Sequence, residues 1–160
     1  MRLTLIGVGR LKSGPERELF DRYFKRAADL ARSQGISAVE AREVEEGRGR
    51  RAEERRAEEA RAIVAAVPKG AWLTLLDERG AAMTSAQWAA EIGKARDGAT
   101  PAYAVAIGGP DGLDPALRAE ARTILSFGAM TWPHQLVRVM ASEQLYRALS
   151  ILGAHPYHRG

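Results

Sequence analysis

Two strand-length runs in this chain are apolar at nearly every consecutive position. They are AWLTLL (residues 71–76) and AYAVAI (residues 102–107). A strand that is apolar on both faces is typical of a parallel sheet with helices on both sides. Parallel strands cannot be joined by tight hairpins, so each one must be followed by a long crossover segment. These two runs therefore favour an α/β architecture.

Other strand-like and helix-like segments alternate around these runs. Further strands are expected at residues 2–8, 36–44 and 123–127. Helices are expected at residues 15–33, through a charge-rich segment that ends near Val67, and at residues 85–97, 115–122 and 133–152. Five strands that alternate with helices predict a parallel sheet covered by helices. Since no linker or internal repeat divides the chain, one domain over residues 1–160 is expected.

The composition is that of an ordinary globular protein, with 46% hydrophobic and 28% charged residues. No apolar run approaches the roughly 20 residues that cross a bilayer, so no membrane partner is expected. The chain has no cysteine, which fits a cytoplasmic location, and its three histidines show neither HxxxH nor HExxH spacing. We therefore expect no metal site. The net charge of +4 permits a nucleic-acid partner without establishing one.

The charge-rich segment, residues 42–61, contains seven arginines and seven glutamates and so carries no net charge. Opposite charges that recur three or four positions apart are typical of a solvated helix with side-chain ion pairs. On this interpretation the helix follows a mobile loop at residues 47–49. The alternative is a loop that faces RNA through Arg48, Arg50 and Arg51.

In open parallel sheets, ligands bind beyond the carboxyl ends of the strands. Three such ends combine apolar side chains with glycine: Leu76-Asp77, Gly108-Gly109-Pro110, and the segment from Phe127 to Trp132. Such loops suit a flat heteroaromatic base whose edge pairs with backbone groups. The segment 108–112 could also be a tight turn and nothing more. No GxxxxGK[ST] phosphate loop occurs in the sequence. The Gly7-Val8-Gly9 run is not a complete GxGxxG motif, because Lys12 takes the place of the last glycine.

All three histidines lie in the last fifth of the chain, at positions 134, 155 and 158. Histidine is the side chain that titrates near neutral pH, so this concentration indicates a site. His134 follows Pro133 at the start of a predicted helix, where a capping or packing role is expected. The tail HPYHR (residues 155–159) is the more probable location of reactive groups.

Four strings in this order resemble the RlmH family: IGGPDGL (107–113), SFGAMTWPHQLVRV (126–139), EQLYRA (143–148) and HPYHR (155–159). The opening RLTLIGVGRLK (2–12) is also similar, so the resemblance covers nearly the whole chain. Members are small bacterial SPOUT methyltransferases. The resemblance implies S-adenosylmethionine as cofactor and a C-terminal trefoil knot. It also implies methylation of N3 of a pseudouridine in large-subunit (23S) ribosomal RNA, on assembled ribosomes.

The resemblance carries particular roles onto residues of this chain. Cofactor-binding positions are expected at Leu76, Gly108, Phe127, Gly128, Ala129, Met130, Thr131 and Trp132. As a separate hypothesis, His155, Tyr157 and His158 are candidates to orient the base or relay its proton, and Arg159 or Arg147 to hold phosphate or a uracil oxygen. Two alternatives remain open. The tail histidines could be exposed residues without a role in the reaction, and Arg147 could form an ion pair that is purely structural.

The helix predicted at residues 133–152 has a broad apolar stripe, which predicts a homodimer through this helix. The resemblance implies the same, with the tail of one subunit completing the pocket of the other. Two other functions stay open at this point. One is a knotted methyltransferase with another acceptor, such as a ribose 2′-OH. The other is a non-catalytic ribosome-binding protein with the same fold.

Overall fold

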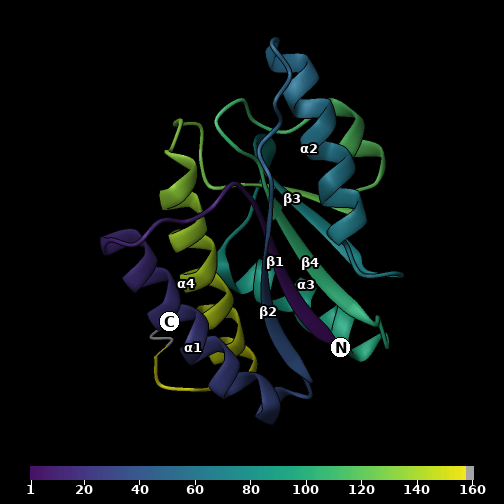
Figure 1. Cartoon of the computed structure of the whole chain (residues 1–160). Helices are drawn as coiled ribbons and strands as arrows, with labels where there is room; N and C mark the ends of the chain where they lie inside the picture. Colours follow the sequence, from purple (N-terminus) through teal and green to yellow (C-terminus); the bar gives the residue numbers. More distant parts are fainter. Residues whose placement is uncertain (158–160) are drawn as a thin grey trace.

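The fold was analysed in a computed structural model that describes residues 1–157 (Figure 1). The strands are β1 (Arg2–Val8), β2 (Ala38–Val44), β3 (Trp72–Ala82), β4 (Ala102–Ile107) and β5 (Thr123–Ser126). The α-helices are α1 (Pro15–Ala31), α2 (Ala52–Ala66), α3 (Ser85–Asp97) and α4 (His134–Leu152). Two 3₁₀ helices, η1 (Arg32–Gln34) and η2 (Pro115–Ala119), complete the elements.

The five strands form one sheet in the order β2-β1-β4-β3-β5, and every pairing is parallel. The predicted α/β fold with a parallel sheet is therefore confirmed. All five strands end at the same edge of the sheet, which is the upper edge in Figure 1. The loops that follow β3, β4 and β5 consequently share that edge.

The strands alternate side chains between two apolar layers. In β4, Tyr103, Val105 and Ile107 belong to the larger layer, which also contains buried residues of α1, α3 and α4. Ala104 and Ala106 of the same strand belong to the smaller layer, beneath α2 and η2. All six residues of β4 are buried, as the continuous apolar run predicted.

Helix α4 is covered mainly by its own chain. It packs between α1 and α3, and nine of its residues are buried, among them Val139, Leu145 and Leu149. The breadth of its apolar stripe is thus largely accounted for within one subunit. Only its first turns keep a large apolar side chain in solvent, Leu136 at 39% exposure.

Most predicted element ends agree with the structure to within a few residues. Thr84 is the N-cap of α3 and accepts a hydrogen bond from the backbone N–H of Gln87, as expected for a capping residue. Gly35 ends the first helical segment in the left-handed conformation. The helix predicted at residues 115–122 is shorter than expected, since only the 3₁₀ helix η2 forms there.

Strand β3 continues past the expected end at Leu76. Its register against β5 shifts between Leu76 and Ala81, so residues 77–80 make an excursion before pairing resumes. A Cβ atom on Gly80 would lie 2.6 Å from the backbone carbon of Leu125. Glycine therefore permits the close approach of this excursion to β5, and residues 77–79 are free to line the edge of the sheet.

A buried hydrogen-bond network closes the opposite, amino edge of the sheet. The Tyr103 hydroxyl donates to Glu91 Oε1 (2.5 Å) and accepts from Trp88 Nε1 (2.8 Å). Thr123 donates to the other oxygen of Glu91 (3.0 Å) and accepts from Trp72 Nε1 (3.0 Å). The network joins β3, β4, β5 and α3. Burial and the adjacent Glu91 raise the pKa of Tyr103, which keeps the hydroxyl protonated.

No helix among residues 1–157 has the length and apolar character needed to span a membrane. The trefoil knot and the assignment of the chain to a single domain stay predictions.

The substitution Tyr103→Phe tests the amino-edge network. It removes the hydroxyl that Glu91 and Trp88 share, and leaving buried partners unsatisfied costs about 1–3 kcal/mol. We expect a loss of that size in the free energy of unfolding by urea titration. Tyr146→Phe, which removes the same atom from a buried tyrosine outside this network, should change stability much less. Equal losses in the two variants would contradict the role of the network.

Candidate functional site

A cavity of about 480 Å³ lies at the carboxyl edge of the sheet. The loops after β3, β4 and β5 surround it, with α2 and the start of α4 at its sides. Its lining includes Leu76, Asp77, Glu78, Arg79, Ile107, Gly108, Asp111, Phe127, Gly128, Met130, Thr131, Trp132 and His134. The three strand ends singled out in the sequence therefore meet at one cavity. Ala129 lies within the last loop, although it is not among the lining residues.

The inner wall of the cavity is apolar side chain and bare backbone. Leu76 and Ile107 are 8% and 2% exposed at the ends of β3 and β4. A Cβ atom on Gly108 would come within 2.9 Å of the backbone of Gly112, so this loop folds tightly on itself. These features can hold a flat apolar ring and leave backbone N–H and C=O groups within reach of its edge.

The loop after β5 is held by Ser126. Its hydroxyl donates to the Gly128 carbonyl (2.9 Å) and accepts from the Gly128 backbone N–H (3.1 Å). Gly128 has a φ of 116°, a conformation that side-chain-bearing residues rarely adopt. Beyond it, Met130 and Trp132 are 73% and 42% exposed at the mouth of the cavity. This loop combines a fixed backbone with unusually exposed large apolar side chains.

The rim of the cavity contains charges of both signs. Arg118 donates to Asp77 at 3.2 Å, and the backbone N–H of Arg79 donates to the other Asp77 oxygen at 2.8 Å. Glu78 accepts a long hydrogen bond from Thr131 at 3.5 Å, which links the loop after β3 to the loop after β5. The carboxylates are thus partly neutralised and also connect neighbouring loops.

An arginine of the charge-rich segment fixes the loop after β4. Arg55 of α2 donates two hydrogen bonds to the carboxylate of Asp111, at 2.7 and 3.0 Å. Arg56 also donates to the Asp111 carbonyl at 3.4 Å. The Arg55 guanidinium lowers the pKa of Asp111, and the carboxylate in turn raises the pKa of Arg55. Sequence reasoning missed this contact, because its partners are 56 positions apart and each also has nearer opposite charges.

Glu59 lies beneath the same loop. Its side chain is 3% exposed, and Oε1 accepts from the Gly47 backbone N–H at 2.9 Å. Oε2 has no hydrogen-bond partner among the described residues and lies 3.6 Å from where a Cβ of Gly109 would be. Burial raises the pKa of Glu59, although the Gly47 hydrogen bond acts in the opposite direction. An ionised Glu59 is therefore costly to the folded chain.

The first turns of α4 bring His134 and Arg138 to this edge of the sheet. His134 lines the cavity, and burial together with the nearby Arg138 lowers its pKa, so the imidazole is neutral at pH 7. It does not cap the helix, whose N-cap is Pro133. The buried Arg138 donates to the carbonyls of Val8 and Gly9. The Arg138 guanidinium therefore lies against the Gly7-Val8-Gly9 backbone, where a dinucleotide-binding motif would hold a phosphate. It fits there because Gly7 has no Cβ atom.

The candidate residues of the tail gather around Glu143. Arg147 donates to Glu143 Oε1 at 2.6 and 2.9 Å, and the Tyr157 hydroxyl donates to the same oxygen at 2.9 Å. Burial and Glu143 raise the pKa of Tyr157, which makes the phenol a hydrogen-bond donor and not a base at neutral pH. His155 is exposed, and its Nδ1 accepts from the Tyr157 backbone N–H at 3.2 Å. His158 and Arg159 lie outside the described residues.

Arg147, His155 and Tyr157, the described members of this group, do not line the cavity. Thirteen helical positions separate His134 from Arg147, a rise of about 20 Å at 1.5 Å per residue. Glu143 lines a second cavity of about 500 Å³, between α1, α3 and α4, which reaches the other side of the Phe127–Gly128 loop. Within one subunit, Arg147 and Tyr157, which bond to Glu143, therefore lie away from the cavity that the predicted cofactor residues line.

The fold and the cavity define a parallel α/β protein with a cavity at the carboxyl ends of its strands, where ligands bind in folds of this class. The family model described as "Predicted SPOUT methyltransferase" matches residues 1–158. The ribosomal RNA large subunit methyltransferase H of Rhodopseudomonas palustris (strain HaA2) is 55% identical over 159 residues, with 99% of each chain covered. The protein of the same name from Nitrobacter hamburgensis is 52% identical over the full length of both chains.

The chain therefore belongs to the SPOUT methyltransferases and, within them, to the ribosomal RNA large subunit methyltransferase H (RlmH) family. The relative of the same name from Methylobacterium radiotolerans is 55% identical, with 100% of this chain and 98% of the relative covered. Among solved structures, the SpoU methyltransferase AviRb from Streptomyces viridochromogenes, in complex with AdoMet, aligns at a TM-score of only 0.39. It is 12% identical, and the alignment covers 90% of this chain and 56% of that one. Family membership rests on the sequence matches.

Asp111 and Glu59 should show opposite pH dependence of stability. The lowered pKa of Asp111 means that its ionised form stabilises the folded chain above its usual value, and this is lost as the pH falls through the folded-state pKa. The melting temperature of Asp111→Asn should lie below that of the unsubstituted protein at pH 7. The deficit should narrow as the pH falls below about 4.

The raised pKa of Glu59 reverses the sign, because ionisation above its usual value destabilises the folded chain. Glu59→Gln should therefore melt at a higher temperature than the unsubstituted protein at pH 8, with the gain fading toward about pH 4. Scanning calorimetry between pH 3.5 and 8 measures both variants. Parallel pH profiles for the two variants would contradict the assigned environments.

Proposed function

We propose that the protein is a methyltransferase that transfers a methyl group from S-adenosylmethionine to N3 of a pseudouridine in large-subunit (23S) ribosomal RNA. One observation carries the proposal. Leu76, Gly108 and the loop from Phe127 to Trp132, far apart in the sequence, line one cavity in a member of the RlmH family. The proposed setting is the assembled ribosome in the cytoplasm.

The residues present fit the proposed cofactor. Leu76, Ile107 and Phe127 offer an apolar surface to an adenine ring, and the tight turn at Gly108 exposes backbone groups to the edge of the ring. The Ser126 hydroxyl fixes the Gly128 backbone through two hydrogen bonds. When bound, S-adenosylmethionine supplies a methyl group activated by a sulfonium. The loops hold and orient the cofactor and exclude water from it.

The acceptor requires other groups, because N3 of the base must lose a proton. The candidates are His155, Tyr157, His158, Arg159 and Arg147. Arg147 has N–H groups beyond the two that it donates to Glu143, so it is suited to donate hydrogen bonds to uracil oxygens or phosphate. The Tyr157 hydroxyl donates its one hydrogen to Glu143 and can accept a hydrogen bond from the base. His155 Nδ1 accepts from the Tyr157 backbone, so the neutral ring carries its proton on Nε2 and can donate a hydrogen bond from there to orient the base.

The separation of the tail from the cavity supports a homodimer in which one subunit's tail reaches the partner's cavity. In the proposed dimer, the interface includes the first turns of α4. Met130, Trp132 and Leu136 are three of the five large apolar side chains that the described residues leave exposed, and the first two line the cavity. The proposed interface uses less of α4 than the sequence predicted, because α1 and α3 already cover the rest of the helix.

Methyl transfer from labelled S-adenosylmethionine to ribosomes that lack the modification tests the proposal. We expect label on N3 of a pseudouridine in 70S ribosomes and little label in isolated subunits. Label on a ribose 2′-OH would establish a methyltransferase with another acceptor. Cofactor and ribosome binding without any transfer would contradict the enzymatic function and favour a non-catalytic ribosome-binding protein.

Mixed dimers test the shared site. Gly108→Val should abolish cofactor binding, because the backbone of Gly112 leaves no room for the larger side chain. Tyr157→Phe should impair transfer while retaining cofactor affinity. If tails act across the interface, a refolded equimolar mixture should regain about a quarter of wild-type activity, since half of the dimers then contain one intact site. Activity no higher than the sum of the parent variants, with dimers present by sedimentation, would contradict the shared site.

A further inference from the structure

The segment between β2 and α2 forms a loop of defined structure at the protruding end of α2. We call residues 46–51 the tip loop. Glutamates of α2 accept hydrogen bonds from its backbone N–H groups: Glu59 from Gly47 (2.9 Å), Glu58 from Arg48 (2.7 Å) and Glu54 from Arg50 (3.1 Å). These three carboxylates are therefore turned toward the backbone. A segment with no net charge thus has an uneven distribution of charge in space.

The two glycines of the tip loop allow it to lie against α2. A Cβ on Gly47 would overlap the backbone of Arg55, and a Cβ on Gly49 would come within 2.5 Å of Glu54 Cβ. The loop expected to be mobile is instead packed on the first turns of the helix, with its amide groups satisfied by the glutamates.

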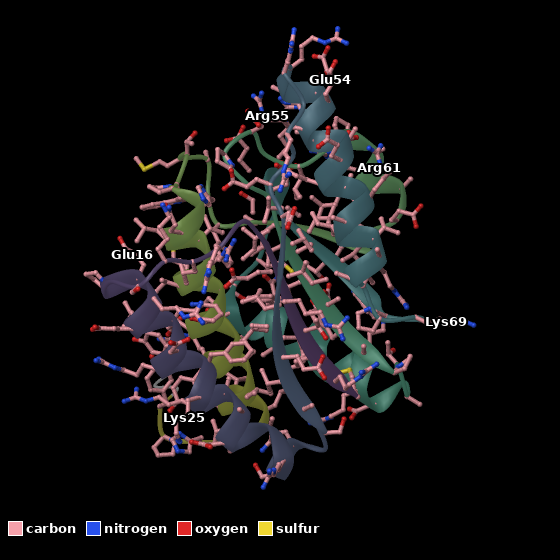
Figure 2. The ribbon with its side chains drawn as sticks, viewed as in Figure 1. Glu16, Lys25, Glu54, Arg55, Arg61 and Lys69 are labelled. Atoms are coloured by element: carbon pink, nitrogen blue, oxygen red, sulfur yellow. The ribbon has the colours of Figure 1, made fainter. Side chains whose placement is uncertain are left out.

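The arginine side chains of the tip loop project into solvent. The side chains of Arg48 and Arg51 are 85% and 70% exposed, and Arg50 is also exposed. Arg48 pairs with Glu45, whose side chain is itself 86% exposed, and Arg51 pairs with Glu53 and Glu54. Exposed ion pairs contribute little free energy, so a phosphate can displace them at low cost. Figure 2 shows Glu54 and Arg55 at this protruding end of α2 and Lys69 beyond its other end.

The tip loop is joined to the candidate cofactor cavity through Arg55. The guanidinium that binds Asp111 also donates to the carbonyls of Gly49 and Arg50, at 3.1 and 3.0 Å. One side chain therefore fixes the tip loop and the cavity loop relative to each other. The tip loop precedes the end of α2 that protrudes beyond the carboxyl edge of the sheet (Figure 1), which is the edge at which the cavity lies.

We propose that Arg48 and Arg50, with Arg51 beside them, bind the phosphate backbone of ribosomal RNA next to the nucleotide that enters the cavity. This inference rests on the proposed function. Guanidinium groups match phosphate geometry, and the backbone of RNA provides phosphates at regular intervals along a strand. An enzyme with a net charge of only +4 has to concentrate its cationic side chains where the RNA lies. The tip loop is such a place, because three nearby carboxylates of α2 are engaged by its backbone N–H groups while its arginines stay exposed.

The double variant Arg48→Gln/Arg50→Gln tests the inference, and Lys69→Gln/Lys94→Gln is its control. The control removes the same charge from two exposed lysines, one after α2 and one on α3, away from the tip loop. Neither pair lies in the catalytic or cofactor-binding groups. Ribosome affinity is measured between 50 and 300 mM salt, together with cofactor affinity, kcat and the KM for ribosomes.

We expect the tip-loop variant to bind ribosomes roughly tenfold more weakly and to lose about one to two units of salt slope. Its kcat should stay within about twofold, because phosphate contacts position the RNA and take no part in the reaction. Cofactor affinity should be unchanged in both variants, and the control should match the wild type. A photo-crosslinking residue in place of Arg50 should label ribosomal RNA.

Wild-type ribosome affinity and salt slope in the tip-loop variant would overturn the inference and leave the proposed function intact. Crosslinking confined to a ribosomal protein would also overturn it. If the wild type transfers no methyl group but loses ribosome affinity on Arg48→Gln/Arg50→Gln substitution, the RNA-binding surface stands and the proposed enzymatic function fails.

Discussion

The burial of both faces of β4 governs where polar chemistry can occur in this protein. A central parallel strand whose six residues are all buried can meet polar groups only at its two ends. The amino end is closed by the Tyr103 hydroxyl and Glu91, in a network that joins three strands and α3. The carboxyl end instead runs into Gly108, where the chain turns back on itself beside a cavity. The amino end of the sheet is therefore occupied by a stabilising network, whereas the carboxyl end adjoins an open cavity.

The distribution of unpaired polar atoms follows this division. Four buried side-chain atoms among residues 1–157 have no hydrogen-bond partner, and three of them, Arg56 Nε, Glu59 Oε2 and Arg138 Nε, lie near the carboxyl edge. Buried polar groups are normally satisfied, so their concentration there indicates that this part of the fold is not optimised for stability alone. Helix α2 contributes both a stabilising contact and an unsatisfied atom, because Arg55 fixes the Asp111 loop while Glu59 Oε2 lies beneath that loop without a partner among the described residues.

Much of the architecture could be predicted from local patterns. Continuous apolar runs identified β3 and β4, and the rule for parallel sheets placed three loops at one cavity. Contacts between distant charged residues could not be predicted. Arg55 has glutamates one turn away in the sequence, and only the folded chain shows that it binds Asp111. The clustering of histidines was also incomplete as a guide, because the long helix α4 places His134 at the cavity and His155 beyond its other end. The roles of these residues in catalysis stay predictions.

The position of β5 has a consequence for the order in which the protein is assembled. This four-residue strand pairs only with β3, joining Thr74 to Thr123, and its close approach is possible because residue 80 has no Cβ atom. Contacts between such distant segments form late, because the loop between them must first be closed. The last wall of the cavity, from Phe127 onward, follows this strand. A nascent chain can thus build most of its sheet during synthesis, but it has no complete cavity until its final segment has left the ribosome that makes it.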